Sequence, residues 1–307
     1  MTQYADTHVF HGYSEWSVND ESSIDDATAI QRRLHLDPDP ILLWNRLSKP
    51  PVKPTSQLGT DDQTMRWLNV SQGVNYAFTQ AADALTALRA LYPEDRSRPE
   101  PFSAHYAVAR SGLESASLAL WILGPDDPRH RLERHMRNII REVNEEDSYF
   151  KHATSMGREL YPETFTGSKT DKVRKSQKKW RAARRKLLTQ VSEELGIKLN
   201  FDSNVGFATI VREAGEHTRM PGATAEFCWR AISGLSHPSL SRGMSAHNVT
   251  ITRDVPDSPT VTAVVTNKSD MSRTAIETFA MHFRQALELF RQRKLTPSSA
   301  DVPAGAV

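Results

Sequence analysis

A long apolar stretch rich in small residues runs from Phe102 to Leu123, FSAHYAVARSGLESASLALWIL. No proline or glycine pair interrupts it, so the pattern predicts a helix that is packed on nearly every side, with other helices laid around it. Arg110 and Glu114 are its only formal charges. Because they are four residues apart, they share one face of the helix. Burial would require each to pair with the other or with another side chain.

A second strong helical pattern spans Thr60 to Tyr92 and stops at Pro93. Thr60 and Gln63 have the spacing of a capping box at its start. We expect one apolar stripe of this helix to face the core: Trp67, Val74, Phe78, Leu85 and Leu88.

Shorter or more polar helical patterns cover most of the remaining chain. We predict helices at about residues 23–36, 127–156, 171–195, 207–216 and 224–235, and a last one that begins at Asp270 or Ser272. The loop before the 171–195 helix is polar and contains Pro162 and Gly167. The 171–195 helix is expected to turn five apolar residues inward: Val173, Trp180, Leu187, Val191 and Leu195.

The period of the apolar residues changes from helical to alternating at Val249 and Ile251, and again from Val261 to Val265, with DVPDSP between the two runs. This pattern predicts a β-hairpin within residues 247–267. The fold class that follows is all-α, a multi-helix up-and-down bundle with one inserted β-hairpin. We divide the chain into an acidic N-terminal arm and proline-rich connector (1–58, with Trp44 tucked inward), a helical bundle domain (59–295) and a disordered tail (296–307).

Length and composition describe a globular protein whose 307 residues can bury a large core. No run approaches the roughly 20 apolar residues of a membrane span, and the start of the chain lacks the basic and apolar regions of a secretory signal. Cys228 is the single cysteine. We therefore expect a cytoplasmic protein without disulfides and without a membrane partner.

Positive charge gathers in the middle of the chain, where residues 101–200 carry 19 basic and 13 acidic side chains. The segment 168–186 alone holds ten lysines and arginines against one aspartate. On a helix with an inward apolar stripe these charges would form an outward basic ridge, which suits contact with RNA or another polyanion. A solvated face is the alternative interpretation. The residues chosen as nucleic-acid-binding candidates are Lys172, Arg174, Lys175, Lys178, Lys179, Arg181 and Arg185.

Candidate chemistry centres on RAISGLSH, Arg230 to His237, at the end of a predicted helix and just before Pro238. The segment places a histidine seven positions after an arginine. The same kind of spacing occurs five times in the chain, and Arg212/His217 also lies on a predicted helix. That pair stays open as an alternative.

The RAISGLSH segment, preceded by the small-residue-rich helix AVARSGLESASLALWIL, resembles the HEPN superfamily, helical bundles that carry an Arg-x(4–6)-His motif. Similar HEPN-like proteins occur in bacterial defence loci. The resemblance implies a metal-independent ribonuclease with a site composed across a homodimer. It assigns the acid–base role to His237 and charge stabilisation to Arg230. Ala231 departs from the family pattern, in which active members often carry a polar residue at this position.

Arg110 and Glu114 complete the candidate catalytic set. A structural ion pair is one interpretation, and a Glu114 that orients the imidazole of His237 is the other. We expect no cofactor and no metal, because Glu213 and His217 lack a third ligand nearby. Two functions remain: a ribonuclease or RNA-binding protein that uses the Arg-x6-His motif at a dimer interface, and a non-catalytic helical protein-interaction module.

Overall fold

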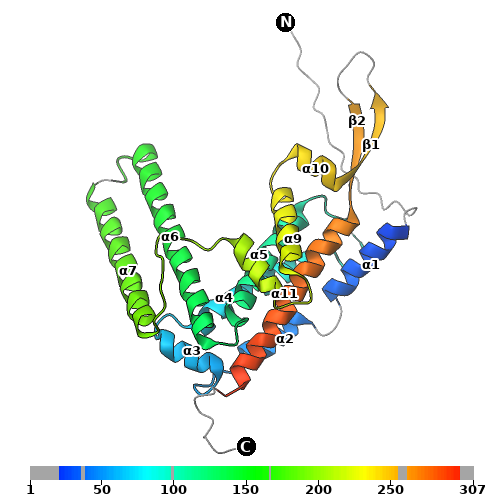
Figure 1. Cartoon of the computed structure of the whole chain (residues 1–307). Coiled ribbons are helices and arrows are strands. Elements are labelled where there is room, and N and C mark those ends of the chain that lie inside the picture. Colours follow the sequence, from blue (N-terminus) through cyan, green and yellow to red (C-terminus); the bar gives the residue numbers. More distant parts are fainter. Residues whose placement is uncertain (1–20, 36–38, 98–99, 166, 255–260, 298–307) are drawn as a thin grey trace, which may run out of the picture.

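The structure is a computed structural model that describes residues 21–35, 39–97, 100–165, 167–254 and 261–297. It is an α-helical bundle with one inserted β-hairpin, as the pattern predicts (Figure 1). The hairpin pairs β1 (His247–Asp254) with β2 (Val261–Asn267) in antiparallel register, with Val249 opposite Val265. Within the described residues, no helix has the length and apolar character needed to span a membrane.

Three helices form the centre of the bundle: α4 (Val70–Leu91), α5 (Ala104–Leu123) and α11 (Ser269–Leu295). The central helix α5 is the apolar stretch that the sequence singles out, and it is packed against α4, α11, α8 and α9. Its Gly112 lies against the ring of Phe279, where a Cβ would come within 2.7 Å of Cζ. The small residues of α5 therefore permit close helix packing on several sides.

The helices α1 (Glu21–His35) and α2 (Pro40–Ser48) contribute to the same core. Asp39 caps α2, because its carboxylate accepts a hydrogen bond from the backbone N–H of Ile41. Trp44 is buried with its ring centroid 5.0 Å from that of Phe78. The part of the proposed proline-rich connector that carries Trp44 is thus a nine-residue helix. Residues 1–20 and 36–38 of the proposed N-terminal arm and connector, and residues 298–307 of the proposed tail, lie outside the described residues.

The prediction of one continuous helix from Thr60 to Tyr92 is wrong in its first third. Two helices occupy this range, α3 (Gln57–Met65) and α4, and they are separated at Arg66, whose φ of 56° lies in the left-handed region. Ser56, rather than Thr60, caps α3 by accepting a hydrogen bond from the N–H of Gly59. The break turns Trp67 outward, so this residue of the predicted inward stripe is 87% exposed.

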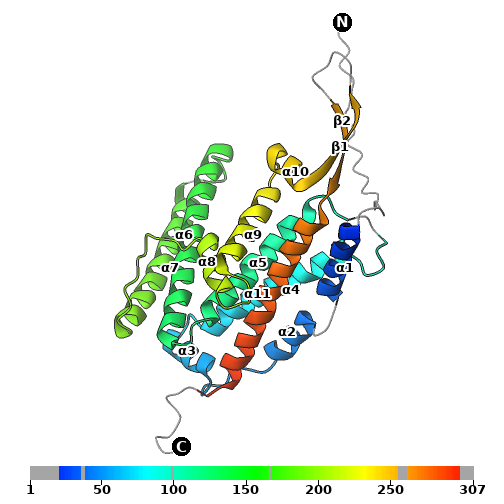
Figure 2. The same cartoon turned by 45° about the vertical axis from the view of Figure 1, so that its right-hand side comes forward.

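Two long helices, α6 (Pro128–Leu160) and α7 (Gly167–Glu194), form a hairpin whose far end projects away from the bundle (Figures 1 and 2). Asp127 caps α6 through the N–H of Arg129. The predicted inward stripe of α7 packs against the core only near the bundle, where Val191 is buried and Leu187 and Leu195 are partly buried. Val173 and Trp180 are 46% and 38% exposed, because the projecting part of α7 meets α6 alone.

The site region is built by α8 (Phe207–Gly215), α9 (Gly222–Leu235) and the short α10 (Leu240–Ala246). The helices α8 and α9 pack against each other and against α5. Gly222 permits the close approach of α8, since a Cβ there would lie 2.2 Å from the carbonyl oxygen of Arg212. Figure 1 shows α9 leading into α10 and then into the hairpin at the end of the bundle opposite α3.

Candidate functional site

The two charges of α5 form the ion pair that their spacing predicts. Arg110 Nε donates to Glu114 Oε1 at 2.9 Å. The same carboxylate oxygen accepts a hydrogen bond from the indole Nε1 of Trp229 at 2.8 Å. Glu114 therefore links α5 to α9 and fixes the direction of the guanidinium, in a position where only 18% of its own side chain is exposed.

His237 follows α9 and reaches the same place. Its Nε2 lies 3.4 Å from Nη1 of Arg110, and the guanidinium carbon of Arg110 lies 5.8 Å from the ring centroid of Trp229. His237 itself is exposed to solvent. We call these four residues, Arg110, Glu114, Trp229 and His237, the Arg110 cluster. It combines a fixed guanidinium with an accessible imidazole.

Arg230, the motif partner of His237, lies in a different contact. Its Nε donates to Glu226 Oε1 at 2.7 Å, and its Nη2 lies 2.7 Å from the same oxygen. Arg212 Nε lies 2.5 Å from the other oxygen of Glu226. The Arg230 hydrogen bond, followed by the Arg212 charge, lowers the pKa of the Glu226 carboxyl. Among the described residues, the arginine that contacts His237 is Arg110. The sequence motif does not predict the contact between Arg110 and His237, because the two residues are 127 positions apart.

The two residues of the alternative pair, Arg212 and His217, also have different partners. Arg212 binds Glu226, whereas His217 Nε2 lies 3.4 Å from Nη1 of Arg134 on α6. In the part of the chain that the structure describes, no three histidine, cysteine, aspartate or glutamate side chains are grouped to hold a metal ion.

The basic ridge lies on α7, and the structure divides its seven candidates into two groups. Arg181 forms an ion pair with Asp147, and Arg185 lies over the ring of Phe201, at 5.5 Å from its centroid. Both therefore help to hold α7 in place. The other five side chains are exposed: Lys172, Arg174, Lys175, Lys178 and Lys179.

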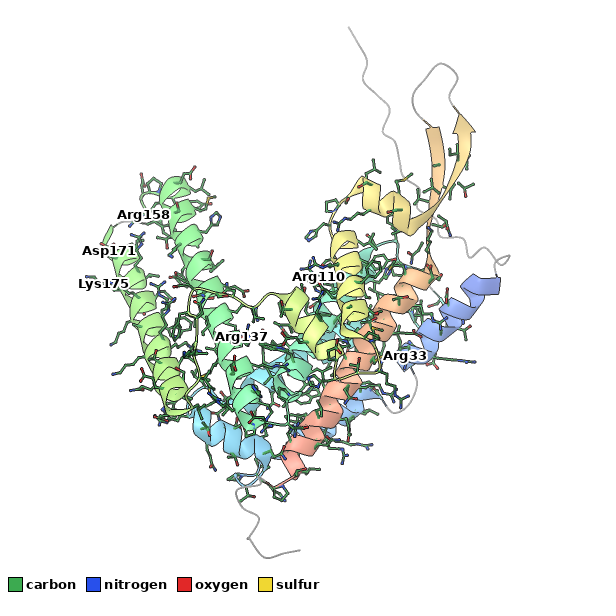
Figure 3. The ribbon with its side chains drawn as sticks, in the orientation of Figure 1. Arg33, Arg110, Arg137, Arg158, Asp171 and Lys175 are labelled. Atoms are coloured by element: carbon green, nitrogen blue, oxygen red, sulfur yellow. The ribbon has the colours of Figure 1, made fainter. Side chains whose placement is uncertain are left out.

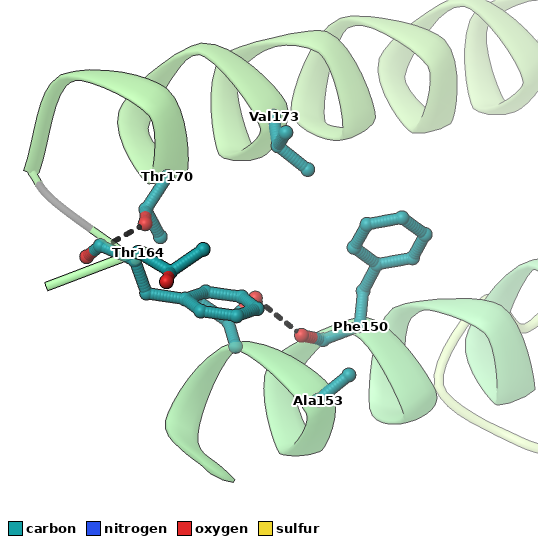
Figure 4. A pocket seen from close by; sticks show the side chains of 7 residues that line it. Phe150, Ala153, Thr164, Thr170 and Val173 are labelled. Atoms are coloured by element: carbon teal, nitrogen blue, oxygen red, sulfur yellow. Dashed lines mark hydrogen bonds between the residues drawn. The ribbon is translucent and has the colours of Figure 1, made fainter. Parts of the chain in front are cut away.

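The ridge and the Arg110 cluster lie on separate parts of the molecule. In Figure 3, Lys175 is on the outer helix of the α6–α7 hairpin, whereas Arg110 lies in the bundle between α5 and α9. An apolar pocket of about 220 Å³ opens between α6 and α7 near their far end, lined by Phe150, Phe165 and Val173 among others (Figure 4). It contains none of the candidate residues.

Comparisons of the chain with family models, with curated proteins and with solved structures found no match. Function is therefore inferred from the geometry of the site.

Proposed function

We propose that this chain is an HEPN-like, metal-independent endoribonuclease whose chemistry is carried by the Arg110 cluster. The observation that supports it is the distance of 3.4 Å between Arg110 Nη1 and Nε2 of the exposed His237. Glu114 holds Arg110 in this position by accepting a hydrogen bond from its Nε. A phosphodiester needs a proton acceptor and a cation at adjoining positions, and this pair supplies both. Arg110, rather than Arg230, takes the charge-stabilising role.

The proposed reaction is a transesterification. Neutral His237 takes the proton of a ribose 2′-hydroxyl, and the 2′-oxygen forms a bond to the adjacent phosphorus. As the bond from phosphorus to the 5′-oxygen breaks, protonated His237 returns the proton to that oxygen. The products are a 2′,3′-cyclic phosphate and a 5′-hydroxyl end, so the step consumes no net proton or electron.

Arg110 stabilises the charge that develops on the phosphorane oxygens. With Nε bound to Glu114, its terminal nitrogens remain for His237 and a ligand. Trp229 keeps Glu114 in position through its indole N–H. A preorganised donor of this kind typically contributes 10²–10³-fold to the rate.

A homodimer and an RNA-binding arm complete the proposal. Phe227 is 70% exposed on α9, and Leu240 is 83% exposed on α10, on either side of His237 in the chain. Apolar side chains of this size suit a partner surface beside the site. The five exposed basic residues of α7 would bind phosphates without reading sequence.

The test is RNA turnover by the wild type and by His237→Ala in the presence of a chelator, with the ends of the products identified. We expect cyclic phosphate ends from the wild type and a loss of at least 10²-fold in rate from the variant. Equal turnover by both proteins would remove His237 from the mechanism.

The second candidate function is a non-catalytic module that binds a protein partner. The exposed apolar residues of α9 and α10 favour it equally, because they provide a docking surface whether or not the site is catalytic. Absence of turnover by the purified wild-type dimer would favour this module.

A further inference from the structure

A second cluster repeats the contacts of the Arg110 cluster with the same four residue types. On one side of α5, Trp121 Nε1 donates to Glu213 Oε2 at 2.7 Å, and Arg134 Nη2 donates to the same oxygen at 3.2 Å. Arg134 Nη1 lies 3.4 Å from His217 Nε2. The guanidinium carbon of Arg134 lies 5.4 Å from the ring centroid of Trp121. We call Arg134, Glu213, Trp121 and His217 the Arg134 cluster.

The two clusters share most of their contacts, but Arg134 binds its glutamate through Nη2 where Arg110 uses Nε, and Arg134 Nη1 also donates to the backbone oxygen of Trp121 at 2.7 Å. In both clusters one glutamate oxygen accepts from an indole and from a guanidinium, the guanidinium lies by the indole ring, and an imidazole Nε2 lies 3.4 Å from its Nη1. The residues come from different helices, because the tryptophan is on α9 in one cluster and on α5 in the other. The similarity is therefore one of chemistry and not of a repeated sequence.

Both clusters lie along one face of α5. At about 100° per residue, Glu114 and Trp121 are seven positions and nearly two full turns apart, so they point in similar directions. The imidazoles are further apart than these two side chains, because His217 lies against Gly124 whereas His237 contacts Arg110, fourteen positions earlier on α5. At about 1.5 Å per residue this is about 21 Å along the axis. That is the rise of about six stacked nucleotides, at about 3.4 Å per phosphate of one strand.

The charges of the Arg134 cluster suit an anion. Arg134 offsets Glu213, and the exposed Arg137 lies one turn further along α6 (Figure 3). The acidic groups near His217 are Asp126, which Arg293 binds, and Glu216, which accepts a hydrogen bond from the N–H of Gly222. Burial, followed by the charge of Arg134, lowers the pKa of His217. With 20% of the Arg134 side chain exposed, a ligand reaches the guanidinium from solvent.

We propose that Arg134 and His217 bind a second phosphate of the RNA strand that is cleaved at the Arg110 cluster. This inference rests on the proposed function and names the form of its substrate: a single strand that spans several nucleotides along the α5 face. The Arg134 cluster positions the strand, and the Arg110 cluster acts on it.

Cleavage of a dinucleotide and of an octanucleotide RNA tests the second site. The dinucleotide has one phosphodiester and occupies the Arg110 cluster alone. We expect His217→Gln and Arg134→Gln to lower kcat/KM for the octanucleotide about tenfold, the effect of one contact of about 1.4 kcal/mol, and to leave the dinucleotide unchanged. His130→Gln, an exposed histidine on α6, is the matched control and should change neither value. Equal losses on both substrates, or on neither, would overturn the inference.

A direct measurement separates this inference from the proposed function. Inorganic phosphate is titrated into the full-length wild type while the imidazole resonances are followed by NMR, with His217→Gln used to assign the His217 signal. A shift of that signal supports the second site even if no RNA is cleaved, in which case only the ribonuclease proposal fails. A signal that phosphate does not move refutes the second site, whatever the RNA assay shows.

Discussion

Three histidines are buried without charge in the core, and they make the stability of the fold dependent on pH. Burial lowers the pKa of His282 from its ordinary 6.5 to about 4, with Ser117 Oγ 2.8 Å from its Nδ1. The unfolded chain therefore binds a proton that the folded chain excludes between these two values. The stability is fully present above pH 6.5 and is lost as the pH falls toward 4.

The magnitude follows from the two pKa values. At about pH 5 an unfolded histidine is almost fully protonated and a folded one with a pKa of about 4 is almost neutral, so His282 costs about 2 kcal/mol of stability relative to pH 7.5. Burial also lowers the pKa of His105 to about 3 and that of His135 to about 4. The three together would cost about 6 kcal/mol, which is comparable to the entire stability of many domains.

His282→Asn tests this reasoning. Asparagine can keep a polar atom near Ser117 but does not titrate. Because its side chain is smaller, the variant is less stable than the wild type at every pH. The difference in unfolding free energy between about pH 7.5 and about pH 5 should shrink by about 2 kcal/mol relative to wild type, measured by urea unfolding. His130→Asn, at an exposed position, is the control. An unchanged difference in His282→Asn would show that this imidazole is not excluded from protonation in the fold.

Further predictions concern the core, the ridge and the dimer. Asp61→Ala should destabilise the fold by about 3–5 kcal/mol in thermal unfolding, because it leaves the buried Arg131 without the carboxylate that lies 2.8 Å from it; a loss below about 1 kcal/mol would contradict this. Replacing Lys175, Lys178 and Lys179 by Gln should weaken single-stranded RNA binding and reduce the slope of log K against log salt by about 0.7 per lost contact, whereas Arg181→Gln, at an internal ion pair, should not. In light scattering at micromolar concentration we expect a dimer that Phe227→Ser weakens; a concentration-independent mass of 34.6 kDa would refute it.

The sequence predicts best what neighbouring residues determine. The central helix α5 follows from its own composition, and the Arg110–Glu114 pair follows from a spacing of four. The β-hairpin follows from alternation within a few residues. In each case the decisive contacts are made inside one element or between adjacent ones.

The features that the sequence does not predict depend on distant contacts. The break at Arg66 interrupts an apolar period, and Arg66 donates there to Glu194, 128 positions away on α7. The arginine beside His237 comes from another helix, so a local motif points to Arg230 instead. Pairing of α5 with α9 decides this contact, and no spacing along the chain encodes it.

In the proposed reaction Arg110, and not Arg230, acts with His237. RNA cleavage by Arg110→Gln and Arg230→Gln, measured side by side as kcat/KM with wild-type folding verified by circular dichroism, tests it most directly. We expect a loss of about 10²–10³-fold for Arg110→Gln and less than about threefold for Arg230→Gln, whose side chain binds Glu226. The reverse order, or equal losses in both variants, would contradict it.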